Sequence, residues 1–354
     1  MPLIHSVTTA LAPNYYDQDA IIEALMAQWS QRYHNPKRIE AFQRNVLVGG
    51  RHLALPMERY PALTGFGDAN QAWIDTAVPM AARAVEELLE KAGLTPSDIS
   101  AITSTTVTGI AVPSIEARLM NVLPFQSTTK RTPLFGLGCL AGVAGINRVG
   151  DYLKGHPTEA AILISVELCS LTLQRDDLSV ANIIASGLFG DGCAAVLMVG
   201  DDHPLASQAP LRWRSPHSAF FPETERVMGW DVVNTGFRVV LSADVPDIVA
   251  RELPQAVNSM LTQAGLSQTR PDFFVAHPGG PKVMRAMEAA LSLDESALRR
   301  SWASLREYGN MSSTSVLFVL KDTLNDLPAS GSVGVMAAMG PAFCAELNVL
   351  TVQS

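Results

Sequence analysis

The chain has 354 residues with 47% hydrophobic and 17% charged side chains, and its formal net charge at pH 7 is −8. This length allows a large core and two domains, and the composition excludes a disordered protein. No basic block accompanies the acidic balance, which argues against nucleic acid as the main partner. No window approaches about 18 consecutive apolar residues, and residues 1–13 do not have the pattern of a signal peptide. We therefore expect a soluble, cytoplasmic protein without a membrane span.

Helical and strand patterns alternate along the first part of the chain. Apolar residues at helical spacing predict helices over residues 20–33, 36–42, 75–92, 115–122 and 140–153. Runs that are apolar on both faces predict buried strands over residues 99–104, 160–166 and 193–199. This alternation predicts an α/β architecture.

The second part of the chain repeats this alternation after a stretch rich in Asp, His, Pro and Ser near residues 200–210. Helices are predicted over residues 248–265 and 281–291 and directly after Asn310, and strands over residues 272–276, 332–338 and 345–352. A cysteine leads into an apolar strand near the end of each part, at Cys193 and at Cys344. We predict two similar halves, residues 1–204 and residues 205–354.

Cys139 lies in a glycine-rich segment, residues 136–145, at the start of a predicted helix. The glycines let the backbone turn sharply and let another group approach the sulfur, and a helix N-terminus favours the thiolate. These features predict a nucleophile, whereas the alternative is a small buried hydrophobe, the usual role of a free cysteine. None of the four cysteines has the spacing of a zinc site or of a disulfide framework, so we expect neither.

Two further windows place a polar residue beside glycine. His277 follows the predicted strand 272–276, and Asn310 follows Gly309. Residues just past strand ends line the ligand crevice of open α/β sheets. Alone, His277 is as readily structural, and Asn310 is more commonly a turn residue or a helix cap. Together with Cys139 they complete a nucleophilic set, in which the imidazole holds the sulfur as thiolate and both side chains donate to an oxyanion.

These windows resemble the signatures of type III polyketide synthases, the chalcone synthase-like family, and in particular its bacterial members. The three catalytic signatures match residues 138–142, 277–281 and 309–313, in the order that the family has them. Further segments match in order at residues 109–113, 187–192 and 244–246. The resemblance therefore covers nearly the whole chain.

The resemblance implies a thiolase-like fold, with two similar halves in αβαβα layers, and a homodimer. It implies that Cys139 takes the acyl group of a starter acyl-CoA and then holds the growing chain as a thioester. His277 and Asn310 would bind the malonyl thioester carbonyl, and the enolate left by decarboxylation would attack the Cys139 thioester. Repeated condensation with malonyl-CoA and a cyclisation would follow. The substrates would be coenzyme A thioesters, and no metal or redox cofactor would take part.

The resemblance also implies which residues surround the reacting groups. Positions that shape the choice of starter and of cyclisation fall at Val107, Cys169, Thr172 and Ser312, and Val112 matches a loop residue that crosses the dimer interface. Contacts to coenzyme A fall at Arg38, Arg44 and Lys282, whose charges would meet its phosphates.

Two parts of the chain depart from the family pattern. Residues 338–342 replace the usual Gly-Phe-Gly-Pro-Gly with Ala-Met-Gly-Pro-Ala, so the cavity wall should differ. Residues 211–240 do not align cleanly, so the two phenylalanines that gate the pocket in the family are not assigned. Within this region, we expect Trp230 and Phe237 to line the cavity. The alternative for each is a place in the hydrophobic core.

Three other classes remain as alternatives. A β-ketoacyl-acyl-carrier-protein synthase III uses the same residue types, but its histidine window usually reads His-Gln-Ala-Asn, where this chain has His-Pro-Gly-Gly at residues 277–280. A papain-like cysteine protease has the same chain order but a Cys-Gly-Ser-Cys-Trp motif that this chain lacks. A non-catalytic acyl-CoA-binding module would keep the fold without the chemistry. As product, an alkylpyrone or an alkylresorcinol made from a fatty acyl-CoA starter is predicted.

Overall fold

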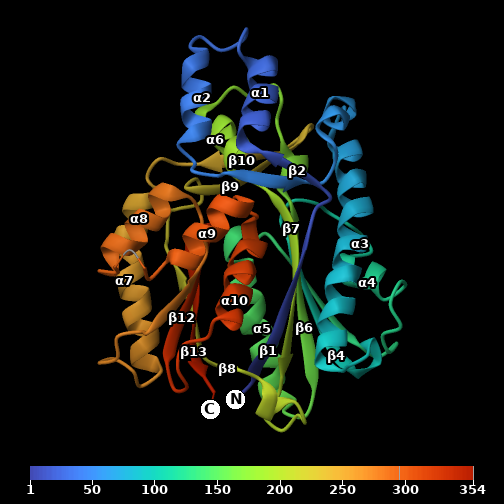
Figure 1. Ribbon diagram of the computed structural model, residues 1–354, viewed down its shortest axis with the longest axis vertical. Helices are drawn as coiled ribbons and strands as arrows, with labels where there is room; N and C mark the ends of the chain where they lie inside the picture. The colour runs from blue at the N-terminus through green and yellow to red at the C-terminus, as the bar shows by residue number, and fades with distance from the viewer. Residues whose placement is uncertain (295, 354) are drawn as a thin grey trace.

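The computed structural model of the chain describes residues 1–294 and 296–353. Within this part, a nine-stranded mixed sheet runs through the molecule, with helices on both of its faces (Figure 1). The strand order is β11 (Phe273–Ala276), β12 (Val333–Gly340), β13 (Cys344–Val352), β8 (Leu211–Phe220), β1 (Leu3–Leu11), β7 (Asp191–Val199), β6 (Ala160–Leu168), β4 (Ile99–Thr106) and β5 (Lys130–Phe135). Outside this sheet, β2 (Asn14–Asp17) pairs with β3 (Gly50–Leu53), and β9 (Met228–Val233) pairs with β10 (Gly236–Leu241).

Helices and strands alternate in αβαβα layers (Figure 1). One outer layer is α3 (Phe66–Ala92), which packs on β1, β6 and β7. The central layer is α5 (Ala141–Gly155) with α10 (Ser315–Asn325), and both halves of the sheet contact it. The other outer layer is α7 (Val245–Gln263), which packs on β8 and β13 and is backed by α8 (Pro281–Ala290). The layered α/β arrangement expected from the sequence is confirmed.

The shorter helices gather around the ends of these layers. At the top of Figure 1, α1 (Gln18–Trp29), α2 (Pro36–Arg44) and α6 (Val180–Leu188) lie beside β9 and β10. The helix α9 (Arg299–Tyr308) packs on α10, and α4 (Ile115–Leu119) packs on α3. This end of the molecule is therefore built from segments that are far apart in the sequence.

The central strands confirm the buried runs that the sequence predicted. Every residue of β6 and of β7 is buried, because helices cover both faces of this part of the sheet. The helix α3 differs from the prediction, since it starts at Phe66 rather than at residue 75. Its first turns have little apolar periodicity, and Trp73 anchors them by packing into the core, where it is 1% exposed.

The two halves of the chain meet within the sheet, where β1 lies between β7 and β8. The division of the chain into two halves between residues 204 and 205 stays a prediction.

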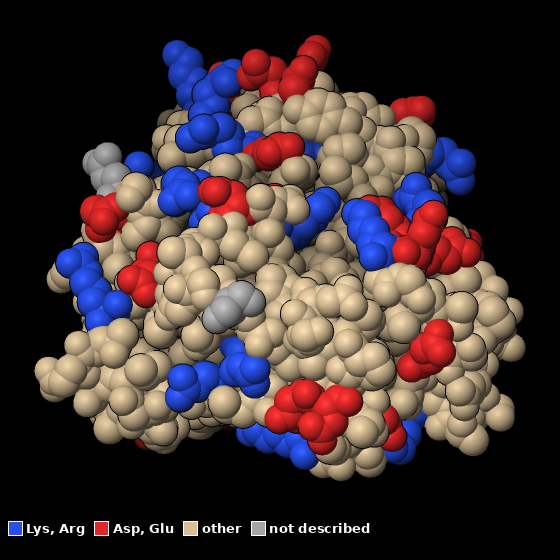
Figure 2. All heavy atoms as spheres, turned by 60° about the horizontal axis from the view of Figure 1, so that its bottom comes forward, with Lys and Arg blue, Asp and Glu red and all other residues tan. Residues whose placement is uncertain are grey.

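On the face shown in Figure 2, basic and acidic side chains are interspersed around a broad uncharged area. Among the described residues, no helix combines the length and the apolar character needed to cross a membrane.

The first turn of α5 packs directly on the turn that precedes α10, and this contact depends on Gly142. A Cβ at Gly142 would overlap the carbonyl oxygen of Ser313 and a methyl group of Val316. We expect Gly142→Ala to lower the free energy of unfolding by about 1–3 kcal/mol, as overpacking does elsewhere. Urea unfolding would measure this loss. Gly155→Ala at the other end of α5, where the added methyl meets no atom within 4 Å, is the control and should change stability little.

Candidate active site

Cys139 lies where the chain passes from β5 into the central helix layer. It is in the middle of a short 3-10 turn, Gly138–Leu140, and α5 begins two residues later, at Ala141. Gly138 has a φ of 53°, and a Cβ there would overlap the ring of Pro341. Glycine is thus required beside the cysteine, and the predicted place of Cys139 at a helix start is confirmed.

His277 directly follows β11, at the carboxyl end of a parallel pair of strands. Its main-chain N–H donates to the carbonyl of Ala337 on β12 at 3.0 Å, which continues the ladder and fixes the residue. The side chain is 6% exposed, and neither ring nitrogen has a hydrogen-bond partner among the described residues. A buried imidazole with two unused nitrogens is costly unless a ligand uses them.

Asn310 is fixed through both its backbone and its side chain. Its N–H donates to the carbonyl of Leu188 at 2.9 Å, and its own carbonyl accepts from the N–H of Gly190 at 3.0 Å. The side-chain oxygen accepts from the N–H of Ser312 at 2.8 Å, and the side-chain nitrogen donates to the carbonyl of Gly279 at 3.2 Å. One N–H of the Asn310 amide group therefore remains for the Cys139 sulfur or for a ligand.

These three side chains line one cavity of about 70 Å³, which we call the catalytic cavity. Most of its wall is apolar, from residues such as Met228, Leu241 and Phe343. The residues predicted around the reacting groups that also line it are Val107, Cys169, Trp230 and Ser312. The structure thus brings Cys139, His277 and Asn310 together from segments more than 30 residues apart in the sequence.

Burial dominates the electrostatics of the catalytic cavity. It raises the pKa of the Cys139 thiol to about 12 and lowers the pKa of His277 to about 3, so burial favours the neutral form of each group. The side chains of Ser312 and Asn310 act in the opposite direction on the pKa of Cys139, because they hydrogen-bond its sulfur. Moving the thiol proton to the imidazole would place opposite charges in one cavity, and their attraction offsets the cost of burying each.

Glu167 is a buried carboxyl group close to the catalytic cavity. It accepts hydrogen bonds from the N–H of Val107 at 3.0 Å and from the hydroxyl of Thr108 at 2.8 Å, and Ser313 also donates to it. Burial raises the pKa of Glu167, and these hydrogen bonds oppose the rise. The carboxyl group thereby holds the loop of Val107 against the end of β6.

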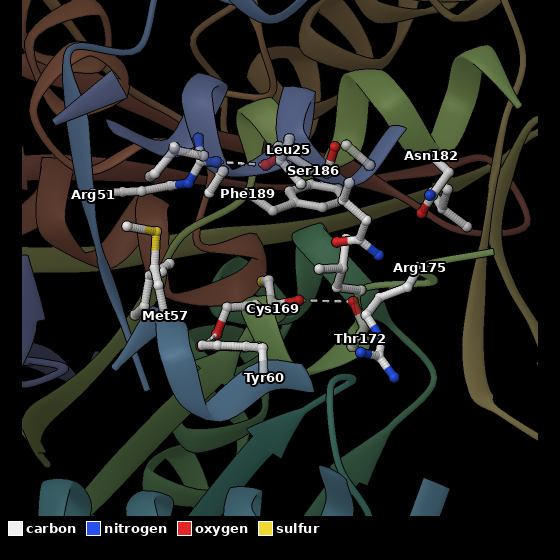
Figure 3. Close-up of a pocket in the computed structure, with 18 of the residues that line it drawn as sticks. Leu25, Arg51, Met57, Tyr60, Cys169, Thr172, Arg175, Asn182, Ser186 and Phe189 are labelled. Carbon is white, nitrogen blue, oxygen red and sulfur yellow. Dashed lines mark hydrogen bonds between the residues drawn. The ribbon is translucent and has the colours of Figure 1, made fainter. Parts of the chain in front are cut away.

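A second, larger cavity of about 190 Å³ adjoins the catalytic cavity, and we call it the side chamber. Cys169, Phe189 and Trp230 line both cavities and separate them. Thr172, predicted as a cavity residue, lines the side chamber and donates to the carbonyl of Cys169 at 2.8 Å (Figure 3). Figure 3 also shows Arg51 at one end of the side chamber and Arg175 at the other.

Phe189 was not singled out by the sequence. It directly follows α6, lines both cavities, and its ring lies 6.2 Å from that of Trp230 between centroids. The signal was present in the matching segment at residues 187–192, which contains this phenylalanine. Its aromatic side chain lies at the border of the two cavities, which is where a gating residue is expected.

Two residues predicted to surround the substrate do not line either cavity. Phe237 is 2% exposed and packs behind Trp230, with the ring centroids 6.3 Å apart. It supports the wall instead of forming it, because its ring packs against the rings of Phe66 and Trp230. Val112 is 91% exposed, in the loop after β4, and lines neither the catalytic cavity nor the side chamber.

The predicted contacts to coenzyme A lie on the surface. Arg38 and Arg44 are exposed on α2, and the guanidinium of Arg44 pairs with Asp19 and Glu40 at 2.8 and 2.9 Å. Lys282 is exposed in the first turn of α8, directly before Val283, which lines the catalytic cavity. Among the described residues, no cluster of three or more His, Cys, Asp or Glu side chains could hold a metal ion.

Comparison with known proteins matches both parts of the chain to one family. The model for the FAE1/type III polyketide synthase-like protein matches residues 68–213, and the model for the C-terminal domain of chalcone and stilbene synthases matches residues 213–353. A 1,3,6,8-tetrahydroxynaphthalene synthase of Streptomyces peucetius subsp. caesius is 42% identical over 351 residues, which are 98% of this chain and 92% of that protein. The chain belongs to the type III polyketide synthase family.

Other relatives of the synthase agree with this assignment. A phloroglucinol synthase of Pseudomonas fluorescens is 33% identical over 86% of each chain. The crystal structure of 1,3,6,8-tetrahydroxynaphthalene synthase from Streptomyces coelicolor superposes with a TM-score of 0.93, at 29% identity over 99% of both chains. The thiolase-like fold is thereby confirmed. The synthase is an acyltransferase that extends acyl-CoA with malonyl-CoA by decarboxylative Claisen condensation.

Proposed function

We propose that Cys139 is the nucleophile of this synthase and that His277 and Asn310 bind the malonyl thioester carbonyl. The observation that supports this proposal is the meeting of the three side chains in one cavity, where neither ring nitrogen of His277 has a partner among the described residues and one N–H of Asn310 is left for the Cys139 sulfur or for a substrate oxygen. Cys139 takes the starter acyl group and releases coenzyme A. His277 accepts the thiol proton during this transfer, since it is the imidazole that lines the catalytic cavity among the described residues.

The two donors then stabilise the charge that develops when malonyl-CoA loses carbon dioxide. The bond between its carboxyl carbon and α-carbon breaks, and the electron pair stays as an enolate whose oxygen accepts from His277 and Asn310. The α-carbon forms a bond with the thioester carbonyl carbon on Cys139, and the sulfur leaves as thiolate. Because no group is oxidised or reduced, coenzyme A thioesters suffice and the proposal includes no metal or redox cofactor.

The size of the side chamber supports a small starter. An apolar cavity of about 150 Å³ holds benzene in another protein, so the side chamber of about 190 Å³ has room for a group of that size. The relatives named above make tetrahydroxynaphthalene and phloroglucinol, which are hydroxylated aromatic rings without an alkyl tail. We therefore favour a hydroxylated aromatic product built from malonyl-CoA with a small starter. The alkylpyrone or alkylresorcinol expected from the sequence stays a prediction.

Incubation with malonyl-CoA and acyl-CoA starters of two to sixteen carbons, with products identified by mass, tests the proposal. We expect cyclised products from several condensations, with malonyl-CoA alone or with short starters. Turnover restricted to long acyl starters would instead establish the alkyl product. A single condensation that requires acyl-carrier protein would indicate the synthase III class, and no condensation with any thioester would leave only a binding module.

The predicted homodimer is part of the same proposal. Apolar side chains are exposed around the edge strand β5 and the preceding loops, at Ile110, Val112, Val122 and Phe135. Burying such side chains against a second copy would remove them from water. Light scattering should give twice the chain mass of 38.0 kDa. The double substitution Val112→Asp and Phe135→Asp should shift the particle toward one chain mass, and a wild-type mass of 38 kDa would contradict the dimer.

A further inference from the structure

The carboxyl end of α6 is held by side chains that come from the first 51 residues of the chain. The last carbonyls of a helix lack partners within it, and in α6 these include the carbonyls of Ser186, Gly187 and Leu188. Arg51 donates to the carbonyls of Ser186 and Gly187, and Gln18 donates to that of Gly187 at 3.0 Å. The third carbonyl, that of Leu188, accepts from the backbone N–H of Asn310.

Arg51 makes these contacts with the end of α6 from a buried position. It is 2% exposed, and its acceptors are the side-chain oxygen of Gln18, at 2.9 Å, and the two main-chain carbonyls, none of which is charged. Burial lowers the pKa of Arg51 to about 10, so the guanidinium remains charged at neutral pH. The negative end of the α6 dipole compensates part of this charge. Because a buried arginine donates to these two carbonyls, we infer that the position of the carbonyls matters.

The same helix end is shared with the active site. Phe189, which separates the catalytic cavity from the side chamber, is the first residue after α6, and its N–H donates to the carbonyl of Ala185 at 2.9 Å. Phe189 and Asn310 form a β-bridge, and Gly190 completes it by donating to the Asn310 carbonyl at 3.0 Å. The chain before Asn310 also packs closely on this helix end, because a Cβ at Gly309 would overlap the Leu188 carbonyl.

We propose that Arg51, with Gln18, is a positioning residue that sets the places of Asn310 and Phe189 through the end of α6. The proposal rests on the role given above to Asn310. A displacement of about 1 Å at a catalytic group can cost about 10²-fold in rate. Loss of the Arg51 contacts should therefore impair the step that uses Asn310, which is decarboxylative condensation, more than the acylation of Cys139.

The test compares two steps in the full-length synthase. Acylation is followed as the mass gain of the protein with starter acyl-CoA in a single turnover, and condensation as kcat for malonyl-CoA consumption. For Arg51→Met we expect condensation to fall about 10- to 100-fold, acylation to stay within about threefold, and the product lengths to change. Arg51→Lys keeps a cation that reaches one carbonyl, and it should recover part of the condensation rate.

Arg300→Met is the matched control. Arg300 also comes from a distant element and donates to the carbonyl at the end of another helix, that of Asp326 after α10, and its side chain is 14% exposed. We expect this variant to lose stability without changing the ratio of the two steps. If Arg51→Met lowers both steps equally, or changes neither, the positioning role is wrong.

A second variant keeps the test decisive if Arg51→Met does not fold. Gln18→Leu removes one of the two donors to the Gly187 carbonyl and one acceptor of Arg51, and it keeps the arginine itself. It should lower condensation relative to acylation at least about threefold, and an unchanged ratio would overturn the proposal. Failure of the wild type to form Cys139-dependent products would instead contradict the proposed function, so the two failures are distinguishable.

Discussion

Cys139→Ala should abolish polyketide formation while the fold stays intact. Without the sulfur no acyl-enzyme forms, and loss of a nucleophile typically costs more than about 10⁴-fold in rate. His277 and Asn310 keep their places in this variant, so slow decarboxylation of malonyl-CoA should continue without carbon–carbon bond formation. Product mass and released carbon dioxide, measured on the same samples, separate the two events.

The control for this experiment is a cysteine that lines neither cavity. Cys193 is fully buried in β7, and Cys193→Ala should retain activity within about twofold with a stability loss of about 1 kcal/mol. Wild-type products from Cys139→Ala would remove the nucleophile assignment. So would an equal loss of activity in Cys193→Ala, because the cause would then be structural.

Much of the fold was predictable because the core strands carry a strong pattern. Residues 160–166 and 193–199 are apolar on both faces, and they became β6 and β7 with every position buried. The family resemblance implied the αβαβα layering, whereas the alternation of these strands with helices predicted an α/β architecture. In contrast, β9 and β10 were not predicted, since strands that lie outside the main sheet alternate weakly and bury few residues.

The candidate site was predictable where chemistry requires a particular residue type. Cys139, His277 and Asn310 each stand beside glycines at the end of an element, and the structure brings them into one cavity. Residues that act through packing gave a weaker signal. Phe189 and Phe237 are both aromatic, and only the three-dimensional structure shows that the first lines the cavities and the second lies behind the wall.

Arg51 shows the same limit for buried polar residues. In the sequence, an arginine between Gly50 and His52 is most simply a solvated surface residue. Its real partners are carbonyls more than 130 residues away, at Ser186 and Gly187. Such a contact has no local pattern, because the strand pairing that brings β3 beside the end of α6 is decided by the whole fold.

Trp230→Ala should change which starters the synthase accepts, because the indole ring is part of the wall between the two cavities. Removing it would join the catalytic cavity of about 70 Å³ to the side chamber of about 190 Å³. We expect kcat/KM for starters of eight or more carbons to rise about tenfold relative to acetyl-CoA, the size of effect that a few methylene contacts give. Rates measured across the same starter series would show this shift.

The control for Trp230→Ala is its neighbour across the hairpin. Val239 pairs with Trp230 between β10 and β9 but lines only the side chamber, so Val239→Ala enlarges one cavity without joining the two. It should leave the ratio between long and short starters within about threefold. Equal shifts in both variants would mean that total volume, and not the wall, sets the preference. No shift in either would mean that the starter chain does not enter the side chamber, and the geometry of the wall would then bear only on the growing polyketide.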